Sequence, residues 1–485
     1  MHSNVFAPQT EELLPPSPPC PQHAEELFDR AMKFHRQDET GLAESLYRQV
    51  LSLCPEHVDA CVYLGLLYSR MEKFTEAAGC FQRAQVLLPR EPAISYQLGS
   101  VLYASGQHQL AIKQFKQTLA MDNTHWQAAY NLGTALLDLG NTAEAIAAYK
   151  KAASLHPQDP DIHFNLGLAH KKSGQLEAAI QAYLCTVEIT PDDAEAHYNL
   201  ALVYKELDCK EDAIAALEIA VALKPDFAAA HGNLGVLYLD QGRESEAIAC
   251  YRQLLSLNHN VEAARHILAA LTGETTAVAP PSYIADLFNN FSSHFEERLL
   301  VDLGYRTPWD LKNLLMGEPG KRKSFPRLLD LGCGTGLVGL AFRDIAPYRV
   351  GVDLSPKMIA EAEAKKLYDQ LAVAEIVDFL QQGDDCFDLI VAADVLIYLG
   401  DLDSVLGALA KRLAQNGRIL FSTEHLVGSG YRLCRSGRYA HSADYIRTVA
   451  GHNGLAVLAS EKSRLRKEKE EWIKGELFVL GFIPA

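Results

Sequence analysis

Several familiar signals are absent from this sequence, and each absence excludes a class of protein. No stretch approaches the run of about 18 apolar residues needed for a membrane-spanning helix, and the first residues lack a basic region followed by an apolar one. The ten cysteines include no Cys-x-x-Cys pair, and no histidines cluster at metal-ligand spacing. We therefore expect a cytoplasmic chain with reduced thiols, no membrane partner and no metal site.

Positive charge is also scarce. Lys and Arg number 45 against 61 Asp and Glu, which gives a formal net charge of -16. Because phosphate binding requires an excess of Lys and Arg on some face, we expect no nucleic-acid partner. The densest basic run extends from Arg464 to Lys469. Glu468 lies within it, and Glu470 and Glu471 follow it directly. This mixture of charges predicts a solvated hairpin tip.

The length and the local composition indicate two folded domains. A chain of 485 residues exceeds what one hydrophobic core usually organises. Closely spaced prolines from Pro15 to Pro21 mark residues 1–23 as an unpacked leader, to which we assign no function. Small polar residues ending in two prolines mark residues 273–281 as a linker. The predicted domains are therefore residues 24–272 and 282–485.

The first domain is built from a repeat of 34 residues. The clearest marker is a glycine that recurs at Gly65, Gly99, Gly133, Gly167 and Gly235. An alanine recurs at the same spacing from Ala43 to Ala247, followed four residues later by an aromatic residue or Leu, and proline closes most units. This is the tetratricopeptide pattern, in which small residues let two antiparallel helices approach closely. We predict an all-α superhelix of seven repeats that share one core, ended by a capping helix at 259–271.

The repeats also carry a ladder of asparagines. Two residues before the glycine slot, four consecutive units have Asn131, Asn165, Asn199 and Asn233. The arrangement resembles the asparagine ladders of other helical solenoids, including the array of the O-linked N-acetylglucosamine transferase, which hold an extended peptide by its main-chain amides. These four residues are therefore candidates for binding a peptide or protein partner. The alternative is that each Asn bonds to the neighbouring helix.

The second domain contains a strand, a glycine turn and a helix, predicted at 327–331, 332–336 and 337–345. Glycines at 332, 334 and 336 suit a backbone that bends sharply and lies close to a ligand. Asp353 ends the next predicted strand, 349–354, where a carboxylate accepts hydrogen bonds from the two hydroxyls of a ribose. Nicotinamide dinucleotides and S-adenosylmethionine both contain such a ribose.

Two features favour S-adenosylmethionine. The third glycine follows the second by two positions, whereas a nicotinamide site wants three. Asp330 also points negative charge at the turn, which repels pyrophosphate and attracts the cationic amino-acid end of S-adenosylmethionine. Further strands at 372–376, 387–394 and 418–423, followed by a C-terminal hairpin, complete the pattern.

Residues 282–485 thus resemble the class I S-adenosylmethionine-dependent methyltransferases, an α/β Rossmann-like family. The resemblance assigns Glu375, or alternatively Asp378, to the adenine and places Asp394 beside the methyl donor. The full set of cofactor-binding residues that it implies is Asp330, Gly332, Cys333, Gly334, Gly336, Asp353, Leu354, Glu375, Ile376 and Asp394.

Methyl transfer from a sulfonium is a direct displacement, so the protein mainly has to align the acceptor and exclude water. A general base is needed only when the acceptor must lose a proton. Asp394, Tyr398 and His441 are the candidate catalytic residues, and His441 stands out because an imidazole titrates near neutral pH. The alternatives are that His441 is a hydrogen-bonded structural residue and that Asp394 only positions the donor or caps a helix.

The whole sequence is similar to a family of bacterial predicted methyltransferases that contain tetratricopeptide repeats. The segments that carry this similarity are LDLGCGTGLVG, GVDLSPKMIAEA, AADVLIYLGDL and SGRYAHS. The family implies methyl transfer and leaves the acceptor open. We expect an enzyme with a docking arm, whose acceptor is a protein or peptide. One alternative is a small-metabolite methyltransferase whose repeats bind a partner protein, and another is an inactive scaffold.

Overall fold

The computed structural model describes residues 20–258, 261–289, 296, 298–317, 324–468 and 471–483. Most of the predicted leader, the start of the predicted capping helix and residues 484–485 lie outside this set. The chain divides into two compact units, residues 1–230 and 231–485. The second unit joins the end of the repeats to the α/β domain, whereas the sequence placed the domain boundary at 273–281.

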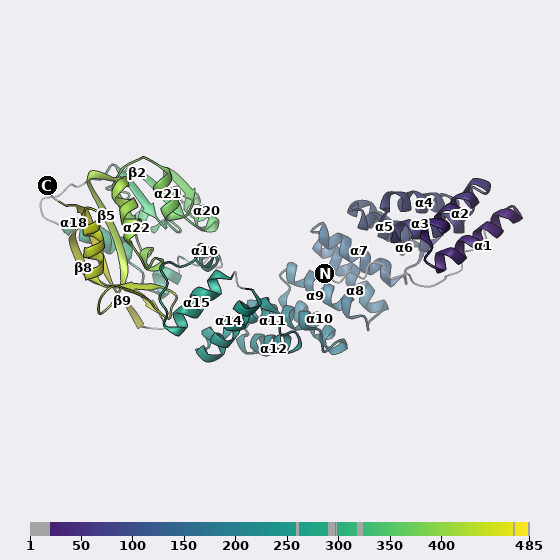
Figure 1. Ribbon diagram of the computed structural model, residues 1–485, viewed down its shortest axis with the longest axis horizontal. Coiled ribbons are helices and arrows are strands. Elements are labelled where there is room, and N and C mark those ends of the chain that lie inside the picture. The colour runs from purple at the N-terminus through teal and green to yellow at the C-terminus, as the bar shows by residue number, and fades with distance from the viewer. Residues whose placement is uncertain are drawn as a thin grey trace. The chain divides into compact units, whose positions relative to one another are not determined.

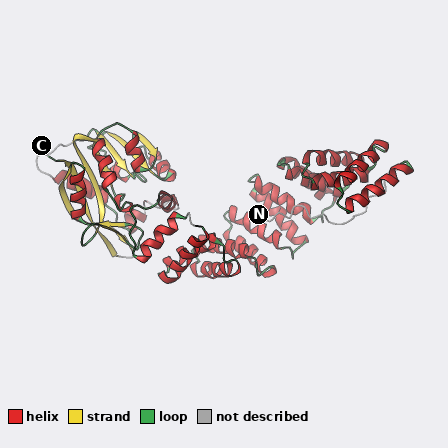
Figure 2. Cartoon of the chain, viewed as in Figure 1, coloured by secondary structure: helices red, strands yellow, loops and turns green. Residues whose placement is uncertain are grey.

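Paired helices of nearly constant length make up the repeats (Figures 1 and 2). Their bounds are α1 (Gln22–Arg36), α2 (Thr40–Leu53), α3 (Val58–Arg70), α4 (Phe74–Leu87), α5 (Pro92–Ala104), α6 (His108–Met121), α7 (Trp126–Asp138), α8 (Thr142–Leu155), α9 (Pro160–Lys172), α10 (Leu176–Ile189), α11 (Ala194–Glu206), α12 (Lys210–Leu223), α13 (Ala228–Asp240) and α14 (Glu244–Leu257). The capping helix is α15 (Glu262–Thr272). None of the described helices has the length and apolarity needed to cross a membrane.

The repeat glycines act as the sequence predicts. A Cβ atom at Gly133 would lie 2.8 Å from the ring of Tyr149, and one at Gly167 would lie 2.8 Å from the ring of Tyr183. Both rings are fully buried. In these pairs the first helix therefore needs glycine at this slot, because the aromatic ring of the second helix fills the space of a side chain.

One expectation about the cysteines is wrong. A disulfide joins Cys20 to Cys54, while the remaining cysteines are free thiols. The two residues are 34 apart, so they occupy the same slot in successive repeats, before Pro21 and Pro55. Stacking brings equivalent slots of neighbouring repeats together, and the Cα atoms of this pair are 6.0 Å apart.

The α/β domain has a single sheet between two layers of helices (Figure 1). The strands are β1 (Arg327–Leu331), β2 (Tyr348–Asp353), β3 (Gln370–Val373), β4 (Phe387–Ala392), β5 (Leu413–His425), β6 (Tyr431–Leu433), β7 (Tyr439–His441), β8 (Leu455–Glu468) and β9 (Glu471–Phe482). The helices are α16 (Pro281–Asn289), η1 (Arg298–Asp302), α18 (Thr307–Gly317), α19 (Leu337–Ala341), α20 (Pro356–Ala364), α21 (Ile376–Gln382), η2 (Leu396–Tyr398), α22 (Asp403–Arg412) and α23 (Ala443–His452).

Strands β1 to β5 run parallel in the order β3-β2-β1-β4-β5. Strand β9 then pairs antiparallel with β5 and with β8, which confirms the predicted C-terminal hairpin. The short β6–β7 hairpin follows β5, and β7 pairs with the last two residues of β5. The carboxyl ends of the parallel strands therefore meet at one edge, which we call the carboxyl edge.

Alternate residues of the central strands face different helix layers. Leu329 and Leu331 pack on the side of α21, α22 and α23, whereas Leu328 packs with α18 and α19. Asp330 shares the face of Leu328, beneath the helix that follows the glycine turn. An all-α repeat array followed by an α/β domain confirms the predicted fold class.

Candidate active site

The glycine turn lies at the end of β1, where all three glycines adopt positive φ angles. The values are 65° at Gly332, 51° at Gly334 and 101° at Gly336, a region that only glycine adopts freely. A Cβ atom at Gly332 would collide with Val395 Cγ2. At Gly334 it would meet no described atom within 4 Å. The turn is thus sterically closed at Gly332 and open at Gly334, where a ligand has room to approach the backbone.

Asp330 lies beneath this turn and is fully buried. Its Oδ2 accepts a 2.5 Å hydrogen bond from the hydroxyl of Tyr368, which itself accepts one from the Gly339 N–H. Asp330 Oδ1 is buried without a hydrogen-bond partner among the described residues. Burial, reinforced by the charge of nearby Asp353, raises the pKa of Asp330 well above its usual value. An unpaired buried carboxyl group of this kind is suited to a cationic ligand.

Asp353 ends β2 beside the same turn. Its two oxygens accept hydrogen bonds of 2.9 Å from the Gly334 N–H and 2.8 Å from the Ser355 N–H. Burial raises the pKa of Asp353, although these backbone bonds oppose the shift. A carboxylate offers about four acceptor positions, so positions remain for the hydroxyls of a ribose. Leu354 is half-buried next to it.

The adenine residues require a correction to the predicted strand boundary. Strand β3 ends at Val373, so Glu375 precedes helix α21 and is not inside a strand. Its carboxylate accepts a 2.9 Å hydrogen bond from the Asp378 N–H and caps that helix, while the side chain stays partly exposed. Ile376 packs against the sheet core. Binding of adenine by Glu375 or Ile376 stays a prediction.

Cys333, within the turn, is buried, and burial raises the pKa of its thiol. The side chain is therefore no candidate nucleophile. No group of His, Cys, Asp or Glu side chains in the described ranges is arranged to hold a metal ion.

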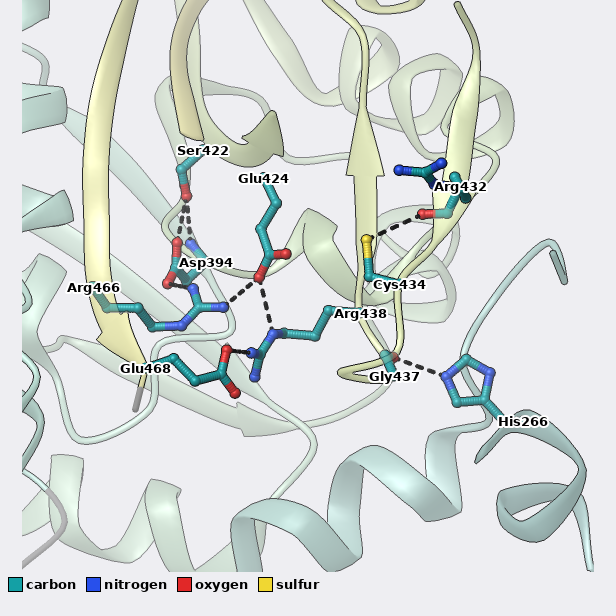
Figure 3. Close-up of polar contacts among 10 residues, drawn as sticks. All are labelled: His266, Asp394, Ser422, Glu424, Arg432, Cys434, Gly437, Arg438, Arg466 and Glu468. Atoms are coloured by element: carbon teal, nitrogen blue, oxygen red, sulfur yellow. Dashed lines mark hydrogen bonds and ion pairs between the residues drawn. The ribbon is translucent and has the colours of Figure 1, made fainter. Parts of the chain in front are cut away.

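Asp394 follows β4 at the carboxyl edge with a left-handed backbone, φ 58°. Such a conformation in a non-glycine residue is maintained by its surroundings. The Ser422 hydroxyl accepts from the Asp394 N–H at 2.8 Å and donates to Asp394 Oδ1 at 2.9 Å. Arg466 Nη1 donates to Asp394 Oδ2 (Figure 3). Each carboxylate oxygen thus already accepts one hydrogen bond, which fixes the orientation of the side chain and agrees with a positioning role for Asp394.

The ion pair between Arg466 and Asp394 extends to three further charged residues (Figure 3). Arg466 Nη2 donates to Glu424 Oε1 at 2.5 Å, and Arg438 Nε donates to the same oxygen at 2.9 Å. Arg438 Nη2 reaches Glu468 Oε2 at 2.5 Å. We call Asp394, Glu424, Arg438, Arg466 and Glu468 the edge network.

The sequence singled out Asp394 but did not predict the ion pairs of the edge network. Arg466 was placed on a solvated hairpin tip, but only 7% of it is exposed. Leu465 beside it is buried, and the ladder between β8 and β9 shifts register between Arg464 and Lys467. The acidic partners Asp394 and Glu424 lie 72 and 42 residues away, so no local charge pattern announces the pairing.

The two other predicted catalytic residues are buried. Tyr398, in η2, is 8% exposed, and burial raises its pKa to about 12. His441 is 1% exposed, its Nε2 lies 3.0 Å from the Gly400 carbonyl oxygen, and burial lowers its pKa to about 4. The imidazole is therefore neutral at neutral pH and hydrogen-bonded to the backbone, as the structural alternative proposed. Catalysis by either residue stays a prediction.

The side-chain amides of the asparagine ladder donate hydrogen bonds to other residues of the repeat array. Asn165 Nδ2 donates to the Tyr130 hydroxyl and the Asp161 carbonyl oxygen, both at 2.9 Å. Asn131 Nδ2 donates to the Tyr96 hydroxyl at 3.3 Å, and Asn199 Nδ2 donates to the Glu195 carbonyl oxygen at 2.9 Å. Both N–H groups of Asn165 are thus occupied within the array, and peptide binding by the ladder stays a prediction. Asn233 belongs to the second unit.

Two family models match parts of this chain. A family model described as a methyltransferase domain matches residues 329–419, and a tetratricopeptide repeat model matches residues 64–125, 96–160, 130–194 and 210–266. Among solved structures, that of MamA is 27% identical and covers 33% of this chain and 95% of that chain, with a TM-score of 0.33.

The curated relatives each match a limited part of this chain. The mitochondrial ubiquinone biosynthesis O-methyltransferase of Rattus norvegicus is 27% identical over 139 residues, 26% of this chain and 40% of that protein. The malonyl-[acyl-carrier protein] O-methyltransferase of Bacillus cytotoxicus is 34% identical over 100 residues, 20% of this chain and 35% of that protein. The chain therefore spans less than half the length of these relatives. It contains tetratricopeptide repeats followed by a methyltransferase domain.

Proposed function

We propose that this protein transfers a methyl group from S-adenosylmethionine to an acceptor at the carboxyl edge. The observation that carries the proposal is the buried, unpaired Oδ1 of Asp330 beneath an open glycine turn, with Asp353 beside it. The cationic amino-acid end of the donor stabilises the charge of Asp330, and its ribose supplies hydroxyls to Asp353. The same residues argue against an inactive scaffold.

Each group of residues has a distinct task in this function. The donor, when bound, supplies an activated methyl group, and the chain orients it. Gly334 leaves room for the donor at the backbone, and Asp353 fixes both the turn and the ribose. Asp394, held by Ser422 and Arg466, marks the edge where the acceptor approaches. Alignment of acceptor and donor supplies most of the rate, since no proton transfer is obligatory.

Donor binding is tested by calorimetry on the full chain with the variant Asp353→Ala. Loss of the charge-assisted bonds to the ribose should weaken S-adenosylmethionine binding by about 2–4 kcal/mol. Asp384→Ala, at an exposed carboxylate between α21 and β4, is the matched control and should bind like the wild type. Failure of the wild type to bind the donor, or preference for NAD, rejects the proposal.

The acceptor that we favour is a protein or peptide delivered by the repeats, in a cytoplasmic setting. The supporting observation is that one chain carries both a docking module and the enzyme. A small molecule with an oxygen nucleophile is the second candidate. Two observations favour it: the relatives are O-methyltransferases, and the amide of Asn165 is already bonded within the array. In that case the repeats bind a partner protein instead.

A further inference from the structure

Successive residues of the β6–β7 hairpin contact two different parts of the second unit. Gly437 lies against the capping helix, where its carbonyl oxygen is 2.9 Å from His266 Nε2 (Figure 3). Tyr439 has its hydroxyl 2.5 Å from Thr276 Oγ1, just after the same helix. Arg438, between them, reaches in the other direction to Glu424 and Glu468. One short segment, residues 437–439 at the turn of the hairpin, therefore joins α15 to the edge network.

The contact with the capping helix is closely packed. His266 is 2% exposed, and its ring lies 5.1 Å from that of Tyr283 and 5.9 Å from that of Tyr439. A Cβ atom at Gly437 would lie 2.5 Å from the Tyr283 hydroxyl. Close-packed interiors have low compressibility and transmit strain. A displacement of α15 must therefore move residues 437–439.

Within the edge network, both arginines share one acceptor. Glu424 Oε1 accepts from Arg438 and from Arg466, while Arg466 also holds Asp394. The side chains of Glu424 and Arg466 are each 9% exposed, so water cannot replace a lost partner. If Arg438 no longer donates to Glu424, Arg466 becomes the remaining cationic partner of Glu424 in the edge network. The stronger attraction to Glu424 then pulls the Arg466 guanidinium away from Asp394.

We propose that Arg438 is a positioning residue that couples the capping helix α15 to Asp394 through Glu424 and Arg466. That Asp394 lies where the methyl group is transferred rests on the proposed function, whereas the coupling of α15 to Asp394 does not. It follows that a partner bound to the end of the repeats, by displacing α15, alters the position of Asp394. The glycine turn stays unchanged.

Hydrogen–deuterium exchange on the full chain tests the coupling without an acceptor. His266→Ala should speed exchange in residues 431–441 and also in residues 393–400, which contain Asp394. His266→Gln, whose amide can still donate to the Gly437 carbonyl, should exchange like the wild type. Arg432→Met, an exposed arginine on the same hairpin, is the matched control and should change neither segment. Faster exchange confined to α15 and the hairpin overturns the proposal.

Kinetics then separate positioning from simple support of the fold. With tritiated S-adenosylmethionine and an extract of cells lacking the protein, Arg438→Met should lower kcat at least tenfold and leave the dissociation constant of the donor within twofold. Arg438→Lys keeps one charge and should recover part of that loss. Equal losses of donor binding and turnover, or no rescue by lysine, overturn the positioning role. If the wild type does not bind the donor, the proposed function fails while the exchange experiment still decides the coupling.

Discussion

The carboxyl group of Asp330 shows how one residue can favour binding at the expense of stability. It is buried, its Oδ1 has no partner among the described residues, and its pKa is raised because burial disfavours the charge. The variant Asp330→Asn keeps the shape and removes the charge. We expect it to increase the free energy of unfolding of the ligand-free protein by about 1 kcal/mol. It should also weaken donor binding at least tenfold, because the anionic partner of the donor's cationic end is lost.

Denaturant unfolding and calorimetry on the same preparation check both halves of this prediction. Tyr368→Phe is a useful companion, because it removes the hydroxyl that donates to Asp330 and leaves the ring that packs on Gly339 and Gly351. It should destabilise the protein, opposite in sign to Asp330→Asn. A less stable Asp330→Asn protein that binds the donor normally contradicts the prediction.

His441 predicts a dependence of stability on pH. Burial lowers its pKa to about 4, while an unfolded histidine titrates near pH 6.5. Between these values the unfolded chain binds the proton more readily, so this stabilisation is complete above about pH 6.5 and falls by about 3 kcal/mol as the pH drops to 4. His441→Gln cannot titrate and should lack this component. Parallel pH curves of unfolding free energy for wild type and variant would contradict the assignment.

At the scale of elements, the sequence predicted the features that recur or that depend on a local pattern. The 34-residue spacing predicted the helix pairs, and glycine spacing with Asp330 predicted the turn after β1. It did not predict contacts between distant residues. Tyr368 beneath Asp330 depends on how β1 and the residues before β3 come together, and Arg466 beside Asp394 depends on how β8 reaches the end of β4. Those pairings are products of sheet topology, which no window of neighbouring residues contains.

The segment predicted as a linker shows the same limit. Its small residues and prolines indicate a turn, yet the Ala277 carbonyl oxygen accepts from both the Gly400 and Asp401 N–H groups at 2.9 Å. Ala279 donates to the Tyr398 carbonyl oxygen at 3.0 Å and is buried with Tyr398 and Tyr439. Residues 277–279 therefore pack against η2 and belong to the folded α/β domain.

This packing predicts that the α/β domain is incomplete without the segment before it. A fragment starting at residue 282 loses Ala277, Ala279 and α15, which exposes the apolar faces of Tyr398 and Leu433. Compared with a fragment of residues 228–485, it should melt about 5–10 °C lower. Differential scanning calorimetry of the two fragments makes the comparison. Equal melting temperatures would place the domain boundary at 273–281, as the sequence suggested.

At the scale of the whole molecule, the two acceptor classes predict different uses of the repeats. The array would stabilise a bound peptide equally in the ground state and in the transition state. Its loss should therefore increase the KM for the peptide and leave kcat nearly unchanged. The variant that tests this changes four residues together to Ala: Asn131, Asn165, Asn199 and Asn233. The affinity for S-adenosylmethionine should stay the same in either case. A small-molecule acceptor should respond to neither change, because its contacts lie at the carboxyl edge.

Tritium transfer into a cell extract, separated into protein and small-molecule fractions, distinguishes the two classes. For a peptide acceptor, label enters the protein fraction and falls in the ladder variant at subsaturating extract. Because these asparagines also bond within the array, the variant must retain the wild-type helical circular dichroism, and Glu177→Ala on the exposed side of α10 is the matched control. Label found only in small molecules, at equal rates in all three proteins, would assign the repeats to a partner protein and the chemistry to a metabolite.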